Sequence, residues 1–177
     1  PGGTEIGRRI RTVLLDPKSS DLDPVAELLL YTADRVQHVR KTILPAIAAG
    51  KVVICDRYVD ATLAYQGVAR KLGTELIETL HGLLLDNLKP DLTFLLDLPP
   101  EEGLKRAWAQ IDCGNRSGRE TRFEQEEMAF HTRVRNGYLR LAGNEPDRFV
   151  IVNSLASIDD VWKQISTVLE KTFKRGE

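Results

Sequence analysis

The stretch KVVICDRYVDATLAYQG, residues 51–67, decides the expected fold and places the first candidate site. Its apolar residues 52–55 follow a helix-ending Ala-Gly pair, a pattern typical of a strand buried on both faces of a parallel sheet. Asp56 and Arg57 stand where such a strand would end. Because ligands bind at the carboxyl edge of open α/β sheets, the stretch predicts an α/β fold with a charged binding site there.

The residues at this edge suit a phosphate-bearing ligand. The Asp56 carboxylate can hold Mg²⁺ through water, and the Arg57 guanidinium can bind phosphate oxygens through two parallel hydrogen bonds. Tyr65 and Gln66 add an aromatic face and an amide nearby. The alternative is an ordinary Asp-Arg surface pair after a buried strand, which would contribute little.

Length and composition limit the class of protein. A chain of 177 residues suffices for one domain with a substantial core, which we expect to span 1–177. Its 25 basic and 26 acidic residues nearly cancel, so nothing indicates a nucleic-acid or anionic membrane partner. No apolar run approaches a membrane span and no signal segment opens the chain, so we expect a cytoplasmic protein.

Three apolar runs, at 52–55, 92–97 and 148–152, alternate with helical patterns. This alternation predicts right-handed crossovers and a doubly wound parallel sheet. Asp23 as N-cap and Pro24 as first helical residue predict a long helix that bends near Pro45 and ends at Gly50. Further helices are expected after Thr4, after Gly73, and over 101–109, 120–142 and 157–171.

Tyr31 and Arg35 lie four residues apart in the long helix, so they share one face. A half-buried tyrosine packed under an arginine stem has the same spacing. The apolar stripe of the helix after Gly73 likewise has two readings, because it can face the core or a second copy of the chain.

A polar, glycine-rich segment within residues 110–122 is the second part of the sequence that indicates a function. It can be a solvated loop, or a mobile lid that brings cations to a phosphoryl group after the substrates bind. We expect a lid over about 110–122. The arginines in or beside it are Arg106, Arg116, Arg119 and Arg122.

Several of these motifs occur in a fixed order. The segments are Pro1-Gly2-Gly3-Thr4, Ala33-Asp34-Arg35, Asp56-Arg57-Tyr58 and Ala64-Tyr65-Gln66-Gly67. Together they resemble bacterial thymidylate kinases, and the resemblance covers essentially the whole chain. It implies a P-loop nucleoside monophosphate kinase fold, a reaction of ATP and dTMP with Mg²⁺, and a homodimer.

The resemblance also implies roles in binding dTMP. Tyr31, where the family usually has phenylalanine, would stack on thymine, and Arg35 would hydrogen-bond the base edge. Thr62 could bind the same edge, although a hydroxyl-rich turn is an equal alternative. Tyr65 would pack against the deoxyribose, with Gln66 beside it.

The remaining implied roles concern phosphates, metal and adenine. Arg57 would clamp the acceptor phosphate and Asp56 would lie near Mg²⁺. Arg116 and Arg119, at the tip of the lid, would stabilise the transferred group, and Arg116 would also contact ATP. The loop expected to hold adenine contains Asn153, Ser154 and Ala156.

One departure from the family is large, since the sequence contains no G-x-x-x-x-G-K-[ST] phosphate loop. By comparison with the family, two strands and this loop are expected upstream of Pro1, beside the three strands visible here. The polypeptide from Pro1 to Glu177 alone is therefore expected to be inactive as a dTMP kinase. A noncatalytic nucleotide-binding or dimerisation remnant is one alternative. A deoxynucleoside kinase is another, although Arg57 suits an acceptor that already carries phosphate.

Overall fold

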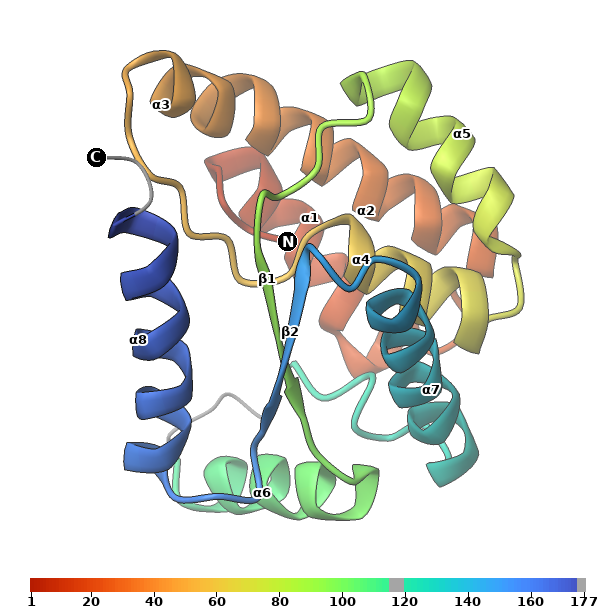
Figure 1. The fold of residues 1–177 in the computed structure, drawn as a ribbon. Helices are drawn as coiled ribbons and strands as arrows, with labels where there is room; N and C mark the ends of the chain where they lie inside the picture. Colours follow the sequence, from red (N-terminus) through yellow and green to blue (C-terminus); the bar gives the residue numbers. More distant parts are fainter. Residues whose placement is uncertain (115–119, 175–177) are drawn as a thin grey trace.

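In a computed structural model of the chain, which describes residues 1–114 and 120–174, helices surround a two-stranded parallel sheet (Figure 1). The strands are β1 (Thr93–Asp97) and β2 (Phe149–Asn153). The α-helices are α1 (Glu5–Leu15), α2 (Pro24–His38), α3 (Leu44–Ala48), α4 (Val59–Thr62), α5 (Thr74–Leu85), α6 (Pro100–Asp112), α7 (Met128–Asn144) and α8 (Ile158–Lys174). Between them lie the 3₁₀ turn η1 (Pro17–Ser19) and the π-helical segments η2 (Val39–Ile43) and η3 (Leu63–Ala69).

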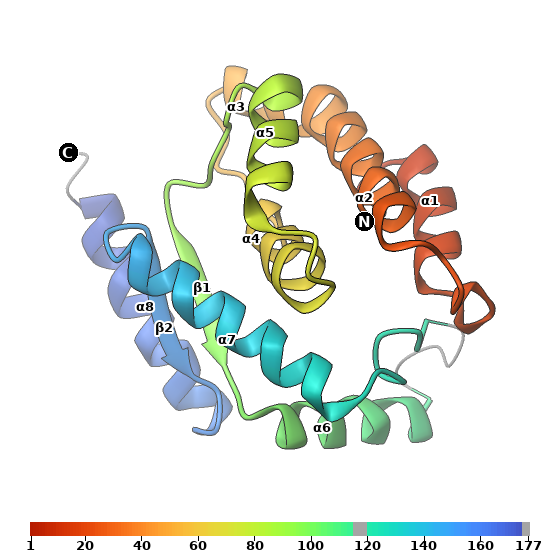
Figure 2. The ribbon, with the colours of Figure 1, turned by 90° about the vertical axis from the view of Figure 1, so that its right-hand side faces the viewer.

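The two strands pair in parallel, from Thr93 opposite Phe149 to Asp97 opposite Asn153. The connection between them contains α6 and α7, as a parallel pair requires. Figures 1 and 2 show α7 and α8 on opposite sides of the strands, so helices cover both faces. This arrangement confirms an α/β fold, and both strands end beside α6.

The strand expected at 52–55 is wrong for the described chain. Residues 51–55 have no strand conformation, and Val52 and Ile54 are 69% and 95% exposed. A strand depends on hydrogen bonds to a neighbouring backbone. In the described ranges, β1 and β2 pair only with each other, so this apolar run has no strand to pair with.

The helix expected after Asp23 is confirmed in its start and its end, and it is irregular before Pro45. The Asp23 carboxylate accepts hydrogen bonds from the backbone N–H groups of Val25 and Ala26, at 2.8 and 3.2 Å. The π-helical segment η2 lies directly before α3, which contains Pro45. Proline has no N–H to donate, which disturbs the regular helical bonding there. Gly50 has a φ of +69°, a conformation that favours glycine at a helix end.

The helix expected over 120–142 begins later, at Met128. Residues 121–126 form turns that fold against the end of α1, where the Arg122 N–H donates to the Leu15 carbonyl and its side chain donates to the Ser19 carbonyl. These bonds tie the turns to α1 and to η1, a tertiary contact that the local sequence pattern does not specify. Helix α6 also extends to Asp112, further than expected.

The core lies between α1, α2, η3 and α7 (Figure 2). Its first hydrophobic cluster includes Leu14, Ala64, Phe123, Phe130 and Val134. A second cluster, including Leu28, Leu63, Ile77 and Phe149, extends this packing to α5 and β2. Burial of these side chains holds η3 against α7, and α2 against α1, α5 and η3.

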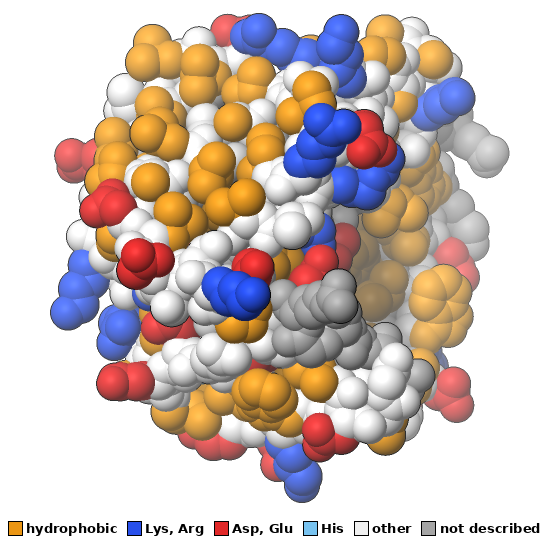
Figure 3. Space-filling view, turned by 180° about the vertical axis from the view of Figure 1, so that it is seen from behind, with side chains coloured by type: hydrophobic (Ala, Val, Ile, Leu, Met, Phe, Trp, Pro, Cys, Tyr) orange, Lys and Arg blue, Asp and Glu red, His pale blue; other side chains and the backbone are white. Residues whose placement is uncertain are grey.

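Hydrophobic side chains also gather on the outer side of α2 and α5, as the view from behind shows (Figure 3). The exposed large hydrophobic residues of these two helices are Val25, Leu29, Leu76, Leu83 and Leu84. Within the described ranges, none of the helices combines the length and the apolar character needed to cross a membrane.

Candidate functional site

Helix α2 places Arg35 against the short helix α4. The Arg35 guanidinium donates to the Thr62 hydroxyl and, at 3.4 Å, to the Tyr58 carbonyl. It also lies 5.6 Å from the centroid of the Tyr58 ring. Burial lowers the pKa of Arg35, an effect that neighbouring anionic groups oppose. The structure therefore brings together Arg35 and Thr62, which are 27 residues apart in the sequence.

Aromatic side chains form a wall next to this pair. The Tyr65 ring meets those of Phe123, Phe130 and Tyr138 edge to face, with centroids 5.4, 6.0 and 6.4 Å away. Tyr31, from α2, contacts Phe123 at 6.5 Å. These five residues are called the aromatic wall below. Such edge-to-face contacts stabilise a fixed ring arrangement, in which Phe123 and Phe130 are buried in the core and the three tyrosines pack against it, partly buried.

Arg57 joins the aromatic wall from the segment before α4. Its guanidinium carbon lies 4.3 Å from the centroid of the Tyr65 ring, within the range of a cation–π contact. Its backbone has a φ of +67°, which is uncommon for a residue other than glycine and occurs often at functional sites. Burial raises the pKa of the Tyr31 hydroxyl, although Arg57 opposes this shift, so Tyr31 stays protonated. Other arginines also lie over rings of the wall, Arg70 over Phe130 at 4.8 Å and Arg122 over Phe123 at 5.3 Å.

Asp56 is exposed beside this cluster, and it fits only part of a magnesium site. Among the residues that the structure describes, no three His, Cys, Asp or Glu side chains lie together as a metal-binding group. Magnesium, however, commonly takes one or two carboxylates and completes its shell with water and substrate phosphates. An exposed single carboxylate agrees with that mode of binding.

A buried carboxylate, Glu27, is a site feature that the sequence reasoning missed. Its side chain is 0% exposed and accepts from the Gln66 amide at 2.7 Å. It also pairs with Arg122 at 2.6 Å and Arg70 at 3.5 Å. Gln66 is itself only 2% exposed, with its amide nitrogen occupied by Glu27. The signal available in the sequence was an acid one turn before Tyr31, next to the apolar run 28–30.

The loop expected to hold adenine forms a turn after β2. The Asn153 side chain accepts from the Leu155 N–H at 3.0 Å, and the Ser154 N–H donates to the Asp97 carbonyl at 2.9 Å. Arg106 of α6 donates to the Ser154 carbonyl at 3.0 Å. Ala156 lies in the same turn, where its N–H donates to Asn153. This loop belongs to a different part of the molecule from the aromatic wall.

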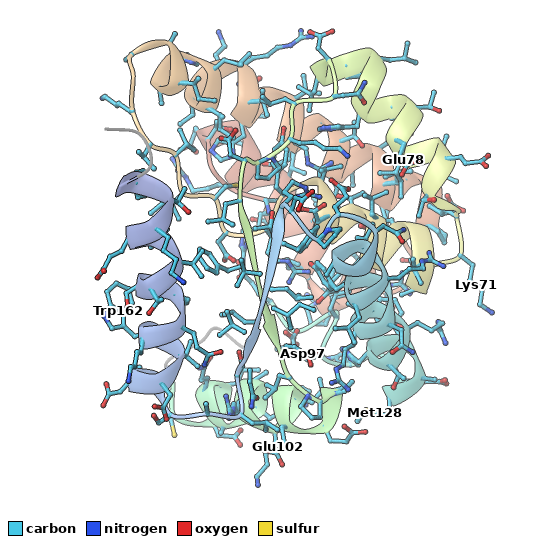
Figure 4. All side chains as sticks on the ribbon, in the orientation of Figure 1. Lys71, Glu78, Asp97, Glu102, Met128 and Trp162 are labelled. Atoms are coloured by element: carbon cyan, nitrogen blue, oxygen red, sulfur yellow. The ribbon has the colours of Figure 1, made fainter. Side chains whose placement is uncertain are left out.

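Asp97, at the end of β1, has a structural partner (Figure 4). Its two carboxylate oxygens accept from Arg135 of α7, at 2.7 and 2.8 Å. These hydrogen bonds lower the pKa of Asp97. The N-cap of α6 is Pro99, so Asp97 joins β1 to α7 and does not cap the next helix.

The arginines of the expected lid divide into two groups. Arg106 and Arg122 are occupied by contacts within the fold, with the Ser154 carbonyl and with Glu27 respectively. Arg116 and Arg119 lie outside the described residues.

The thymidylate kinase family model matches residues 1–165 of the chain. Among similar proteins, the thymidylate kinase of Desulfosudis oleivorans is 52% identical over 171 residues, which cover 97% of this chain and 80% of the relative. That of Desulforapulum autotrophicum is 48% identical, with 93% and 73% covered. That of Trichlorobacter lovleyi is 52% identical, with 94% and 78% covered. The match thus includes α2, the aromatic wall and the loop after β2, and the chain belongs to the thymidylate kinase family.

Proposed function

We propose that the protein transfers the γ-phosphoryl group of ATP to dTMP, giving ADP and dTDP. The observation that carries the proposal is the position of the Arg57 guanidinium over the Tyr65 ring, next to the face of α2 that bears Tyr31 and Arg35. Membership of the thymidylate kinase family supports the same reaction. In keeping with that family, β1 and β2 would be part of a doubly wound sheet of the P-loop kinase type.

The base of dTMP would bind between α2 and α4. We assign stacking on thymine to Tyr31, and hydrogen bonding at the base edge to Arg35 and Thr62, which contact each other. Tyr65 would pack against the deoxyribose, as a neighbour of Phe123. Gln66, expected at the same site, is only 2% exposed and donates to Glu27, so we assign it a supporting role beside Tyr65.

The phosphate of dTMP would bind to Arg57. A phosphate oxygen of dTMP attacks the γ-phosphorus of ATP, the bond to the β-phosphate oxygen breaks, and ADP leaves. Arg57 would hold the acceptor phosphate in line for this attack. Magnesium, held in part by Asp56, would neutralise charge on the ATP phosphates.

Stabilisation of the transferred group falls to Arg116 and Arg119 in this proposal. Phosphoryl transfer places negative charge on equatorial oxygens, which a guanidinium can bind. Arg122 is already paired with buried Glu27, and Arg106 is bound to the loop after β2. The same loop, through Asn153, Ser154 and Ala156, would hold the adenine of ATP, with Arg116 as a further contact.

We also propose a homodimer formed through the outer side of α2 and α5. The exposed Val25, Leu29, Leu76 and Leu83 supply apolar surface there. Burial of such a patch is a common reason for self-association. If the patch is an interface, Leu29→Glu should shift the mass in sedimentation from dimer to monomer.

The test of the function uses the complete protein that contains this chain, with ATP and Mg²⁺. ADP release should be fastest with dTMP and much slower with dCMP or dGMP. Thymidine is the decisive comparison, because a deoxynucleoside kinase would phosphorylate thymidine in preference to dTMP. Binding of dTMP without any ADP release would instead indicate a noncatalytic nucleotide-binding protein.

A further inference from the structure

Glu27 is a completely buried carboxylate whose two oxygens face different partners. Oε1 accepts from the Gln66 amide at 2.7 Å. Oε2 pairs with Arg122 at 2.6 Å and with Arg70 at 3.5 Å. A charge this deeply buried is costly unless it is paired and hydrogen-bonded, so these contacts define one arrangement of the surrounding groups.

The partners of Glu27 come from segments that build the acceptor site. Gln66 and Arg70 belong to or directly follow η3, next to Tyr65. Arg122 directly precedes Phe123, whose ring contacts both Tyr31 and Tyr65. Glu27 itself lies one helical turn before Tyr31 on α2. One carboxylate thus joins the helix that would read the base to the segments that carry Tyr65 and Phe123.

Further contacts hold the partners of Glu27 in place. Arg122 donates to the carbonyls of Leu14 and Ser19, at 3.2 and 2.9 Å. Arg70 also pairs with Glu126 and lies 4.8 Å from the centroid of the Phe130 ring. The network therefore extends from the end of α1, through Glu27, to the start of α7.

We propose that Glu27 is a positioning residue for the acceptor nucleotide, acting through Gln66 and Arg122 on the rings of Tyr65 and Phe123. This inference rests on the proposed function. Glu27 is too deeply buried to touch dTMP itself. Its effect is to hold the aromatic wall at the spacing that the sugar and base require. Because α2 and η3 belong to the dTMP side of the site, its loss should affect dTMP far more than ATP.

The variant Glu27→Gln keeps the size of the side chain and removes its charge. One amide oxygen can still accept from Gln66, but the amide NH₂ then faces the Arg122 guanidinium, donor against donor. Arg122 is left buried without its anion, so the segment that carries Phe123 should shift. Glu27→Asp keeps the charge on a shorter side chain. It should therefore keep part of the positioning that Glu27→Gln loses.

Asp60→Asn is the matched control, because it also removes a carboxylate from a buried ion pair. Asp60 accepts two hydrogen bonds from Arg148, both at 2.8 Å, and both residues are almost fully buried. None of the partners of Glu27 takes part in this pair. Asp60 lies in α4 with Thr62, so the control measures what the loss of another buried ion pair near the proposed dTMP site does to the kinetic constants.

Steady-state kinetics of the complete protein provide the test, with each substrate varied in turn. Glu27→Gln should raise the KM for dTMP about tenfold or more while the KM for ATP stays within about threefold. Asp60→Asn should lower Tm without raising the KM for dTMP more than the KM for ATP. Glu27→Asp should have a KM for dTMP between those of the parent and of Glu27→Gln. Equal changes in both KM values, or the same selective rise in the KM for dTMP in Asp60→Asn, would overturn the proposal. A parent protein that does not use dTMP would overturn the proposed function instead.

Discussion

The proposed dTMP site draws on a few side chains whose partners come from distant parts of the chain. Arg35 has the most specific position, since it contacts Thr62 and the Tyr58 backbone and lies one turn after Tyr31. A residue that contacts only one substrate should affect the binding of that substrate alone.

Arg35→Ala should therefore weaken dTMP binding by about 1 to 3 kcal/mol, the usual effect of losing a hydrogen bond to a charged group. Binding of ATP should change little. Titration calorimetry with each nucleotide measures both effects. Arg40→Ala, on the same helical stretch, is the matched control because the Arg40 side chain donates to the Leu84 carbonyl, away from the aromatic wall. Equal weakening for dTMP and ATP would contradict the role assigned to Arg35.

At the scale of the elements, α7 approaches η3 closely at Gly137. A Cβ at Gly137 would lie 3.3 Å from the Ala64 backbone and from the Val68 side chain. At Gly143, also in α7, a Cβ would meet nothing within 4 Å. The first glycine thus permits a close approach of the two elements, whereas the second does not.

The substitution of leucine at these two positions separates packing from helix propensity. Gly137→Leu should lower the free energy of unfolding by about 1 to 3 kcal/mol, the usual cost of overpacking, because α7 must move away from η3. Gly143→Leu should leave it unchanged or raise it by less than about 1 kcal/mol, since leucine favours a helix more than glycine does. Urea denaturation measures both. If the two variants have the same free energy of unfolding, α7 can move away from η3 without loss of stability, and the packing argument is wrong.

The expected lid is the element on which catalysis should depend. If Arg116 and Arg119 stabilise the transferred group, Arg116→Ala and Arg119→Ala should each reduce kcat, by up to about a hundredfold. The KM for dTMP should stay close to that of the parent. Turnover within about threefold of the parent in both variants and in their combination would contradict the lid assignment.

At the scale of the whole molecule, buried His81 and half-buried His131 predict how stability depends on pH. Burial lowers the pKa of His81 and of His131 below the ordinary 6.5. As the pH falls through 6.5, the unfolded chain gains protons at these positions before the folded chain does, so acid favours unfolding. Asp97 and Glu145 also have lowered pKa values, but their ordinary values of 3.8 and 4.5 place their effect at lower pH.

The free energy of unfolding should therefore fall as the pH is lowered from about 7 to about 5. His81→Gln and His131→Gln should each flatten this dependence. Urea denaturation at several pH values measures the slope. A slope that is unchanged in the double variant would show that these histidines do not account for it.

The sequence by itself determined the helices that follow local signals, and the family. Asp23, Pro45 and Gly50 act within a few residues of their own positions, so their effects on the helix were predictable. The motifs around Arg35, Arg57 and Tyr65 indicated the family for the same reason, because each is a short run with fixed spacing. The roles assigned to individual site residues stay predictions.

Only the tertiary structure decided which distant groups meet. The apolar run 52–55 has the composition of a buried strand, but no strand forms there because pairing needs a neighbouring backbone. The helix expected over 120–142 begins only at Met128, and the residues before it form turns in which Arg122 bonds to the Leu15 and Ser19 carbonyls. Glu27 resembles any acid on a helix until α2, η3 and the segment before α7 come together and bury it. Burial and pairing depend on contacts between residues far apart in the chain, and local spacing does not contain that information.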